Sequence, residues 1–123
     1  MAGALLKKTA ASPDLTPDAV NWTDMTFVHT GSQNGNTQTI SGITAPITLK
    51  VIYSDGQYLL NYKVNAGSFT NIISNSTTIT VSNGDTVQFQ GVGDGIDTIV
   101  DGVTVVNNST GGNTIDTFNV TIF

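Results

Sequence analysis

The sequence predicts an all-β protein, folded as a single antiparallel β-sandwich of about 7–8 strands behind an extended N-terminal arm. Three observations lead to this prediction. The β-branched residues Thr, Val and Ile make up 43 of the 123 residues, which favours strands over helices. Asn and Gly, the residues of tight turns, contribute 12 and 13 more. Turn signals recur about every 8–12 residues, the spacing typical of a sandwich.

The candidate strands follow one another from Thr23 onward. Nine candidate segments give the roughly eight short strands that we expect: 23–29, 37–43, 47–53, 58–64, 69–73, 77–81, 86–90, 103–106 and 118–123. Apolar and polar residues alternate most clearly in 47–53 and 58–64, so each of these segments has one buried face. Asn34-Gly35 and Asn83-Gly84 are strong signals for tight hairpin turns.

The inward phase of these strands predicts the core. Trp22 is expected to pack against one end of the first strand. The remaining expected core residues are Leu49, Val51, Leu60, Val64, Ile79, Val81, Val87, Phe89, Val105, Phe118, Val120 and Ile122. The last strand, 118–123, carries no charge to protect an edge, so we expect it to be central in its sheet or paired with another chain.

We divide the chain into an arm, residues 1–20, and a sandwich domain, residues 21–123. The arm shows little periodicity and has too little apolar surface to fold alone. We expect it to leave the domain and lie across a neighbouring subunit; the alternative is that it folds back along its own domain. The expected partner-binding residues are Leu5, Leu6, Lys7, Lys8, Pro13 and Pro17.

Composition and charge exclude several classes of function. The net charge is −5 and the chain has no Arg, which argues against a nucleic-acid binder that works by charge. The absence of Cys excludes disulfides and thiolate metal sites. No apolar run approaches 18 residues, so we expect no membrane interaction, and we expect no cofactor. The opening residues place Lys7 and Lys8 after a short apolar stretch, unlike a secretory signal, so we expect synthesis in a bacterial cytoplasm.

Three motifs carry a resemblance to a known family. They are Tyr62-Lys63-Val64-Asn65-Ala66-Gly67-Ser68-Phe69-Thr70, Thr80-Val81-Ser82-Asn83-Gly84-Asp85-Thr86-Val87-Gln88-Phe89, and Asp116-Thr117-Phe118-Asn119-Val120-Thr121. Through these motifs, residues 38–123 resemble Ig-like β-sandwich domains of tailed-phage structural proteins and bacterial surface proteins. The resemblance implies an Ig-like fold and a scaffold without a common active site.

Catalytic constellations are weakly represented. His29 is the only histidine, so a Ser-His-Asp arrangement would have to use it. We expect instead a partly exposed histidine at the end of a strand. The chain has no Gly-x-Ser-x-Gly elbow, no Walker loop and no dinucleotide fingerprint, and we expect no enzymatic activity.

A Gly- and Asp-rich stretch between residues 91 and 102 is the one candidate metal site. Gly93–Ile99 partly resembles a calcium-binding β-roll repeat, although Val92 stands where the repeat needs Gly and there is a single copy. Asp94, Asp97 and Asp101 could supply the hard oxygen ligands that Ca²⁺ prefers. The alternative is an acidic turn that keeps the end of a sheet soluble.

These observations lead us to expect a non-enzymatic virion structural protein. The first expectation is a small accessory subunit, a decoration or cement protein, bound to a phage capsid through its arm and sandwich surface and assembled in the host cytoplasm. The partners would be other virion proteins, the major capsid or a tail protein, with self-association as a further option. The alternative is a tail, neck or host-attachment module that binds surface carbohydrate through Trp22, Tyr53, Tyr58 and Tyr62.

Overall fold

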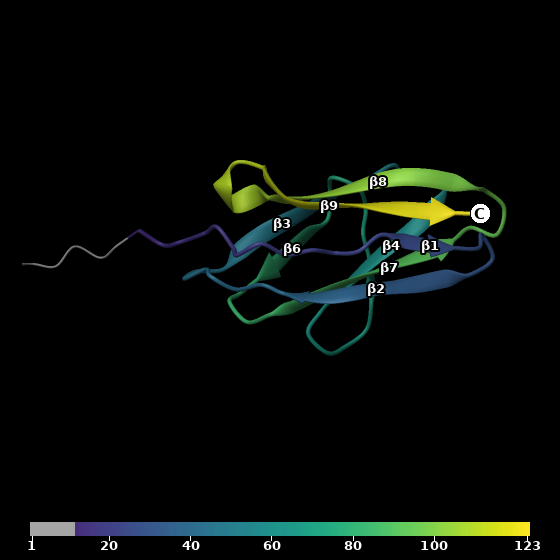
Figure 1. Ribbon diagram of the computed structural model, residues 1–123. Coiled ribbons are helices and arrows are strands. Elements are labelled where there is room, and N and C mark those ends of the chain that lie inside the picture. The colour runs from purple at the N-terminus through teal and green to yellow at the C-terminus, as the bar shows by residue number, and fades with distance from the viewer. Residues whose placement is uncertain (1–11) are drawn as a thin grey trace, which may run out of the picture.

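The structure is a computed structural model that describes residues 12–123 (Figure 1). Strands dominate these residues, in agreement with the high content of β-branched side chains. In chain order the elements are β1 (Met25–Phe27), β2 (Ser32–Thr39), β3 (Ile47–Ile52), β4 (Tyr58–Val64), β5 (Thr70–Asn71), β6 (Thr78–Val81), β7 (Thr86–Gly93), β8 (Ile99–Asn107), the short 3-10 helix η2 (Asn108–Thr110) and β9 (Asn113–Ile122).

The strands form two sheets that pack face to face. One sheet has the order β1-β9-β8-β3-β6 and the other has the order β2-β7-β4-β5. The predicted all-β sandwich is therefore confirmed. The strand pairs are antiparallel except for β1, which runs parallel to β9 with Met25 opposite Val120.

The order of pairing corresponds to that of an immunoglobulin constant-type domain. In such a domain the strands B-E-D and C-F-G are neighbours in the two sheets. Here β2-β7-β4 and β3-β8-β9 take these places in the same chain order. β5 and β6 are inserted between β4 and β7, the third and fourth of these strands in chain order, and β6 extends the sheet beside β3.

Two predicted hairpins are wrong. Asn34-Gly35 lies within β2, next to an irregularity in the register with β7, and the chain turns earlier, where the amide of Gly31 donates to the carbonyl of Val28. Gly84 does adopt the positive φ of a tight turn, +92°, but it joins β6 and β7, which belong to different sheets. A turn signal thus locates a reversal of the chain without deciding whether the flanking strands pair.

The core lies between the two sheets and follows the predicted inward phases. Every residue of the predicted core is buried except Val64, which is half-buried at the margin of the core. Trp22 lies inside the core, not only at the end of the first strand: its ring meets Phe89 edge to face at 5.1 Å and its Nε1 donates to the carbonyl of Val87. As predicted, the last strand is central, because β9 lies between β1 and β8.

Part of the predicted arm, residues 1–20, lies against its own domain instead of leaving it. Leu15 and Val20 pack against the core, and the buried amide of Asn107 donates to the carbonyl of Leu15 at 2.7 Å. The backbones of Asp14 and Asp18 form hydrogen bonds with residues 41–44. The alternative, that the segment folds back along its own domain, is therefore correct for residues 14–20. These few apolar contacts and a buried amide hold a segment that lacks periodicity of its own.

The predicted partner-binding residues divide accordingly. Pro17 is half-buried against its own domain and Pro13 is exposed. Leu5, Leu6, Lys7 and Lys8 lie outside the described residues.

Candidate binding site

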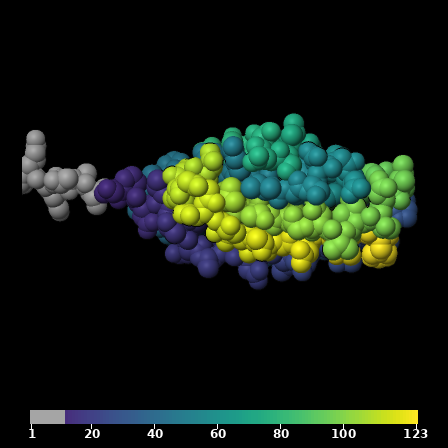
Figure 2. Space-filling view, turned by 90° about the horizontal axis from the view of Figure 1, so that it is seen from above, coloured from purple at the N-terminus to yellow at the C-terminus, as the bar shows by residue number. Residues whose placement is uncertain are grey.

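Exposed apolar side chains gather at one end of the sandwich. We call this the distal end; it is where β1, β3, β7 and β9 finish, and residues 12–20 join the opposite, proximal end (Figure 1). Figure 2 shows the face formed by β8 and β9, with the N-terminal segment at the proximal end and the C-terminal residues at the distal end. Within residues 12–123 the large exposed apolar residues, all at or beside the distal end, are Val28, Ile52, Leu59, Ile73, Ile96, Val100 and Phe123. Clustered exposed apolar residues mark surfaces that bind other molecules.

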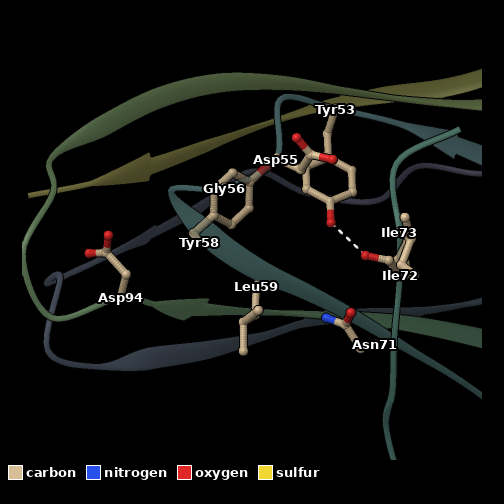
Figure 3. Close-up of a pocket in the computed structure, with 9 residues that line it drawn as sticks. All are labelled: Tyr53, Asp55, Gly56, Tyr58, Leu59, Asn71, Ile72, Ile73 and Asp94. Atoms are coloured by element: carbon tan, nitrogen blue, oxygen red, sulfur yellow. Dashed lines mark hydrogen bonds between the residues drawn. The ribbon is translucent and has the colours of Figure 1, made fainter.

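An open hollow of about 370 Å³ lies at this end (Figure 3). Two buried tyrosine rings, Tyr53 and Tyr58, line it with their centroids 5.4 Å apart. Leu59 and Ile73 also line it and are 53% and 60% exposed. The remaining lining residues are Asp55, Gly56, Asn71, Ile72 and Asp94. The hollow therefore combines aromatic and aliphatic surface with two carboxylates.

The tyrosine hydroxyls are occupied by partners within the protein. Tyr53 donates to the carbonyl of Ile72 at 2.6 Å, and Tyr58 donates to Asp101 Oδ2 at 2.6 Å. The same Asp101 oxygen accepts the backbone amide of Ser54. Burial, followed by the hydrogen bond to Asp101, raises the pKa of Tyr58, and burial raises that of Tyr53. Both phenols are therefore neutral at physiological pH and act as a fixed wall of the hollow.

Asp94 supplies a stable negative charge beside this wall. Its Oδ1 accepts the backbone amides of Ile96 and Asp97, each at 2.8 Å. The hydrogen bond from the Asp97 amide is the largest cause of a lowered pKa for Asp94, whereas the hydrogen bond between the two side chains raises the pKa of Asp97. This is the geometry of an Asp that closes its own turn.

The candidate calcium site is not assembled. Asp101 faces Tyr58 and Ser54 instead of joining Asp94 and Asp97. Among the described residues, no group of three or more His, Cys, Asp or Glu side chains could hold a metal ion. The alternative, an acidic turn at the end of a sheet, accounts for Asp94 and Asp97.

The predicted aromatic platform is also absent. Trp22, Tyr53 and Tyr58 are buried and Tyr62 is half-buried, so no set of these rings is presented on the surface. The outer face of the four-stranded sheet instead carries a row of amides. Asn71 donates to Asn61, Asn61 to Gln90, and Gln90 to Asn34, at 3.2, 2.9 and 2.9 Å. The row crosses all four strands and presents hydrogen-bonding groups to solvent.

His29 is half-buried just after β1, with Nδ1 3.0 Å from the carbonyl of Phe123. This position agrees with the predicted histidine at the end of a strand. Within residues 12–123, the structure contains no helix with the length and apolarity needed to cross a membrane.

The sequence did not single out Leu59, Ile73 and Asp55 as site residues, although it held a signal for two of them. Leu59-Leu60 and Ile72-Ile73 are pairs of adjacent large apolar residues. Neighbouring side chains in an extended segment point to opposite faces, so one member of each pair must face outward unless both faces are covered. No comparable signal places Asp55 beside them.

The chain was compared with protein-family models, curated proteins and solved structures, and none of them matches it. The resemblance to tailed-phage Ig-like domains therefore stays a prediction.

Proposed function

We propose that this protein is a non-enzymatic structural subunit of a bacteriophage particle, an accessory subunit that binds the capsid. The observation that carries the proposal is the difference between the two ends of the molecule. Residues 14–20 are fixed to the proximal end, so the segment that holds Leu5 to Lys8 starts from a defined place. The distal end holds the exposed apolar residues. A protein with two such ends is suited to bridging other proteins.

Three further features support an assembly role. The resemblance of residues 38–123 to phage Ig-like domains implies a scaffold. At the distal end, Asp94 and Asp101 accept internal hydrogen bonds that hold the adjoining loops in place, as suits a scaffold. The deep core, with Trp22 between the sheets, suits a subunit that must persist in a particle outside the cell. The same features would suit a subunit of the tail or neck. The composition of purified particles distinguishes a capsid subunit from a tail or neck subunit.

The test is co-purification with particles. Particles from a lysate of the organism that encodes the chain are banded by density gradient, and the chain is quantified by mass spectrometry across the gradient. We expect it in the particle band in many copies, and in empty capsids as well as tailed particles if it decorates the capsid. A chain that remains in the soluble fractions of every particle preparation overturns the proposal.

The amide row favours a second candidate, a host-attachment module that binds surface carbohydrate. Asn and Gln side chains are suited to hydrogen bonds with sugar hydroxyls, because each amide both donates and accepts. A glycan array probed with the wild type and with Asn61→Ala distinguishes this candidate. Specific glycan binding that is lost in the variant favours attachment; no binding by the wild type removes the candidate.

A further inference from the structure

We propose that the distal hollow binds the N-terminal segment Leu5-Leu6-Lys7-Lys8 of a second copy of this chain, so that copies assemble head to tail. This inference rests on the proposed assembly function and names the partner of its distal site. It draws on the chemistry of the hollow, on the sequence of the segment and on the distance between the two ends.

The hollow and the segment match in polarity. Leu59 and Ile73 present exposed aliphatic surface beside the tyrosine wall, and Asp55 and Asp94 are exposed carboxylates in the same lining. The segment carries two leucines followed directly by two lysines. Residues two apart in an extended segment share a face, so Leu5 and Lys7 would meet the aliphatic surface and a carboxylate together.

The charges of the described residues make this pairing specific. No lysine lines the hollow. Of the two lysines in residues 12–123, Lys63 lies over the ring of Phe69, 5.0 Å from its centroid, and Lys50 lies on β3, in the other sheet. Lys7 and Lys8 are the other half of the positive charge of the chain. Opposite charges in such a contact orient docking and accelerate it.

A copy cannot fill its own hollow with this segment. Thr16 and Pro17 lie beside Asn113, where β9 begins, and the ten residues of β9 carry the chain about 33 Å to the distal end. The first described residues, the purple trace, run outward from the proximal end in Figure 1. Leu6 is six residues before Ser12, a reach of at most about 22 Å. The segment that matches the hollow must therefore come from another molecule.

A contact between the proximal segment of one copy and the distal hollow of the next is heterologous. Contacts of this kind close into rings or continue as open chains, depending on the rotation between copies. Such an array is the arrangement needed for subunits that follow one another across a particle surface. A different protein with an apolar and basic segment is the competing occupant, and the experiment below separates the two.

The experiment uses charge reversal in the full chain. One variant carries Asp55→Lys, an exposed loop position in the hollow, and the other carries Lys7→Asp and Lys8→Asp. Sedimentation velocity is recorded up to about 100 µM, where contacts of micromolar affinity are populated. We expect the wild type to associate, and each variant alone to associate at least about tenfold more weakly, because like charges then meet.

The decisive sample is the mixture of the two variants. In the mixture the unchanged Lys7-Lys8 segment of one variant meets the unchanged hollow of the other, which restores the wild-type contact. Association should therefore return to within about threefold of the wild type and weaken with added salt. Thr117→Lys and Lys50→Asp, both on the sheet that contains β9 and β3 and away from the hollow, are the matched controls and should behave as the wild type.

Two results overturn the inference. A wild type that stays monomeric at every concentration excludes a second copy as the occupant, and recovery of the chain on particles would then point to a different protein in the hollow. Association that survives both reversals places the contact elsewhere. These results leave the particle test of the proposed function standing, whereas a chain that assembles by this contact but is absent from particles overturns only the proposed function.

Discussion

Replacing Phe89 by Ala removes the side chain at the centre of the sandwich. Phe89 is buried in β7, and its ring lies between two others: Trp22 at 5.1 Å, edge to face, and Phe118 at 5.4 Å, tilted by 33°. Trp22 belongs to the N-terminal segment and Phe118 to β9 of the opposite sheet. The ring of Phe89 therefore joins three parts of the chain that are distant in sequence.

The size of the effect follows from these contacts. Truncating a buried Phe to Ala costs about 3–5 kcal/mol through lost transfer energy and an incompletely filled cavity. Two aromatic pairs are lost as well, each worth about 0.5–1.5 kcal/mol beyond burial. We therefore expect a loss near the upper limit, about 4–5 kcal/mol. A domain with a total stability of about 5–15 kcal/mol would be close to unfolding if it lies at the low end.

Equilibrium denaturation with urea, followed by tryptophan fluorescence, measures this loss, because the single Trp22 reports directly on the site. Phe69→Ala is the matched control. Phe69 is half-buried and contacts Lys63 at 5.0 Å, so its removal should cost about 0.5–1 kcal/mol. A loss below about 1.5 kcal/mol for Phe89→Ala, similar to the control, would refute the placement of Phe89 at the centre of the core.

Three further perturbations test other parts of the structure. Burial raises the pKa of Tyr58 above its ordinary value of 10, so the unfolded state releases this proton first. The contribution of Tyr58 to the free energy of unfolding should be constant below pH 10 and be lost above it. Tyr58→Phe should therefore make the fall between pH 10 and 11 shallower, by up to about 1.4 kcal/mol per pH unit, leaving the contribution of Tyr53 in denaturation experiments at pH 8–11. Asn107→Ala leaves the carbonyl of Leu15 without its partner, so unfolding should cost about 1–3 kcal/mol less and amide exchange of residues 14–18 should accelerate. Gly93→Ala places a Cβ against the carbonyl oxygen of His29 and should lower the free energy of unfolding by about 1–3 kcal/mol. Gly102→Ala makes only an ordinary van der Waals contact, with Asn119 Oδ1 at 3.8 Å, and should be near neutral when both variants are compared by thermal denaturation.

The sequence was informative wherever a strand has one buried face. In β3 the alternation of Ile47, Leu49 and Val51 with polar residues identified the inward side chains, and all three are buried. In β2, Ser32–Thr39, every residue is polar or Gly, so periodicity carried no information there. The Asn34-Gly35 signal was then the only guide, and it placed a turn inside a strand. Which strands are neighbours also depends on contacts far apart in sequence, as between β1 and β9, which no local pattern encodes.

The candidate site was harder to predict than the fold because its parts come from three separate segments. The β3–β4 connection provides Asp55, the chain after β5 provides Ile73, and the turn after β7 provides Asp94. Each is unremarkable in its own segment: an Asp in a turn, an Ile near a strand, an Asp in a Gly-rich loop. Only the packing of the two sheets brings them together. The sequence alone could therefore suggest Asp94 as a calcium ligand, but it could not place Asp94 beside an apolar hollow.

The abundance of Asn and Gln has a structural reason at the edge formed by β1 and β2. Side-chain oxygens of Gln38, Asn36 and Gln33 accept the backbone amides of Asn21, Thr23 and Thr26 at 2.7–2.8 Å. The edge strand of one sheet thus bonds the leading segment of the other through its side chains.

The consequence is a covered sheet edge and a fixed path for the N-terminal segment. An open edge is a template for unspecific pairing, and amide side chains cover it here without adding charge. They also hold residues 21–26 along the sandwich, which places Trp22 in the core and directs the preceding residues to the proximal end. The amide side chains therefore help to make the two ends of the molecule different, with the N-terminal segment at the proximal end and the hollow at the distal end. The proposed head-to-tail assembly depends on this difference between the two ends.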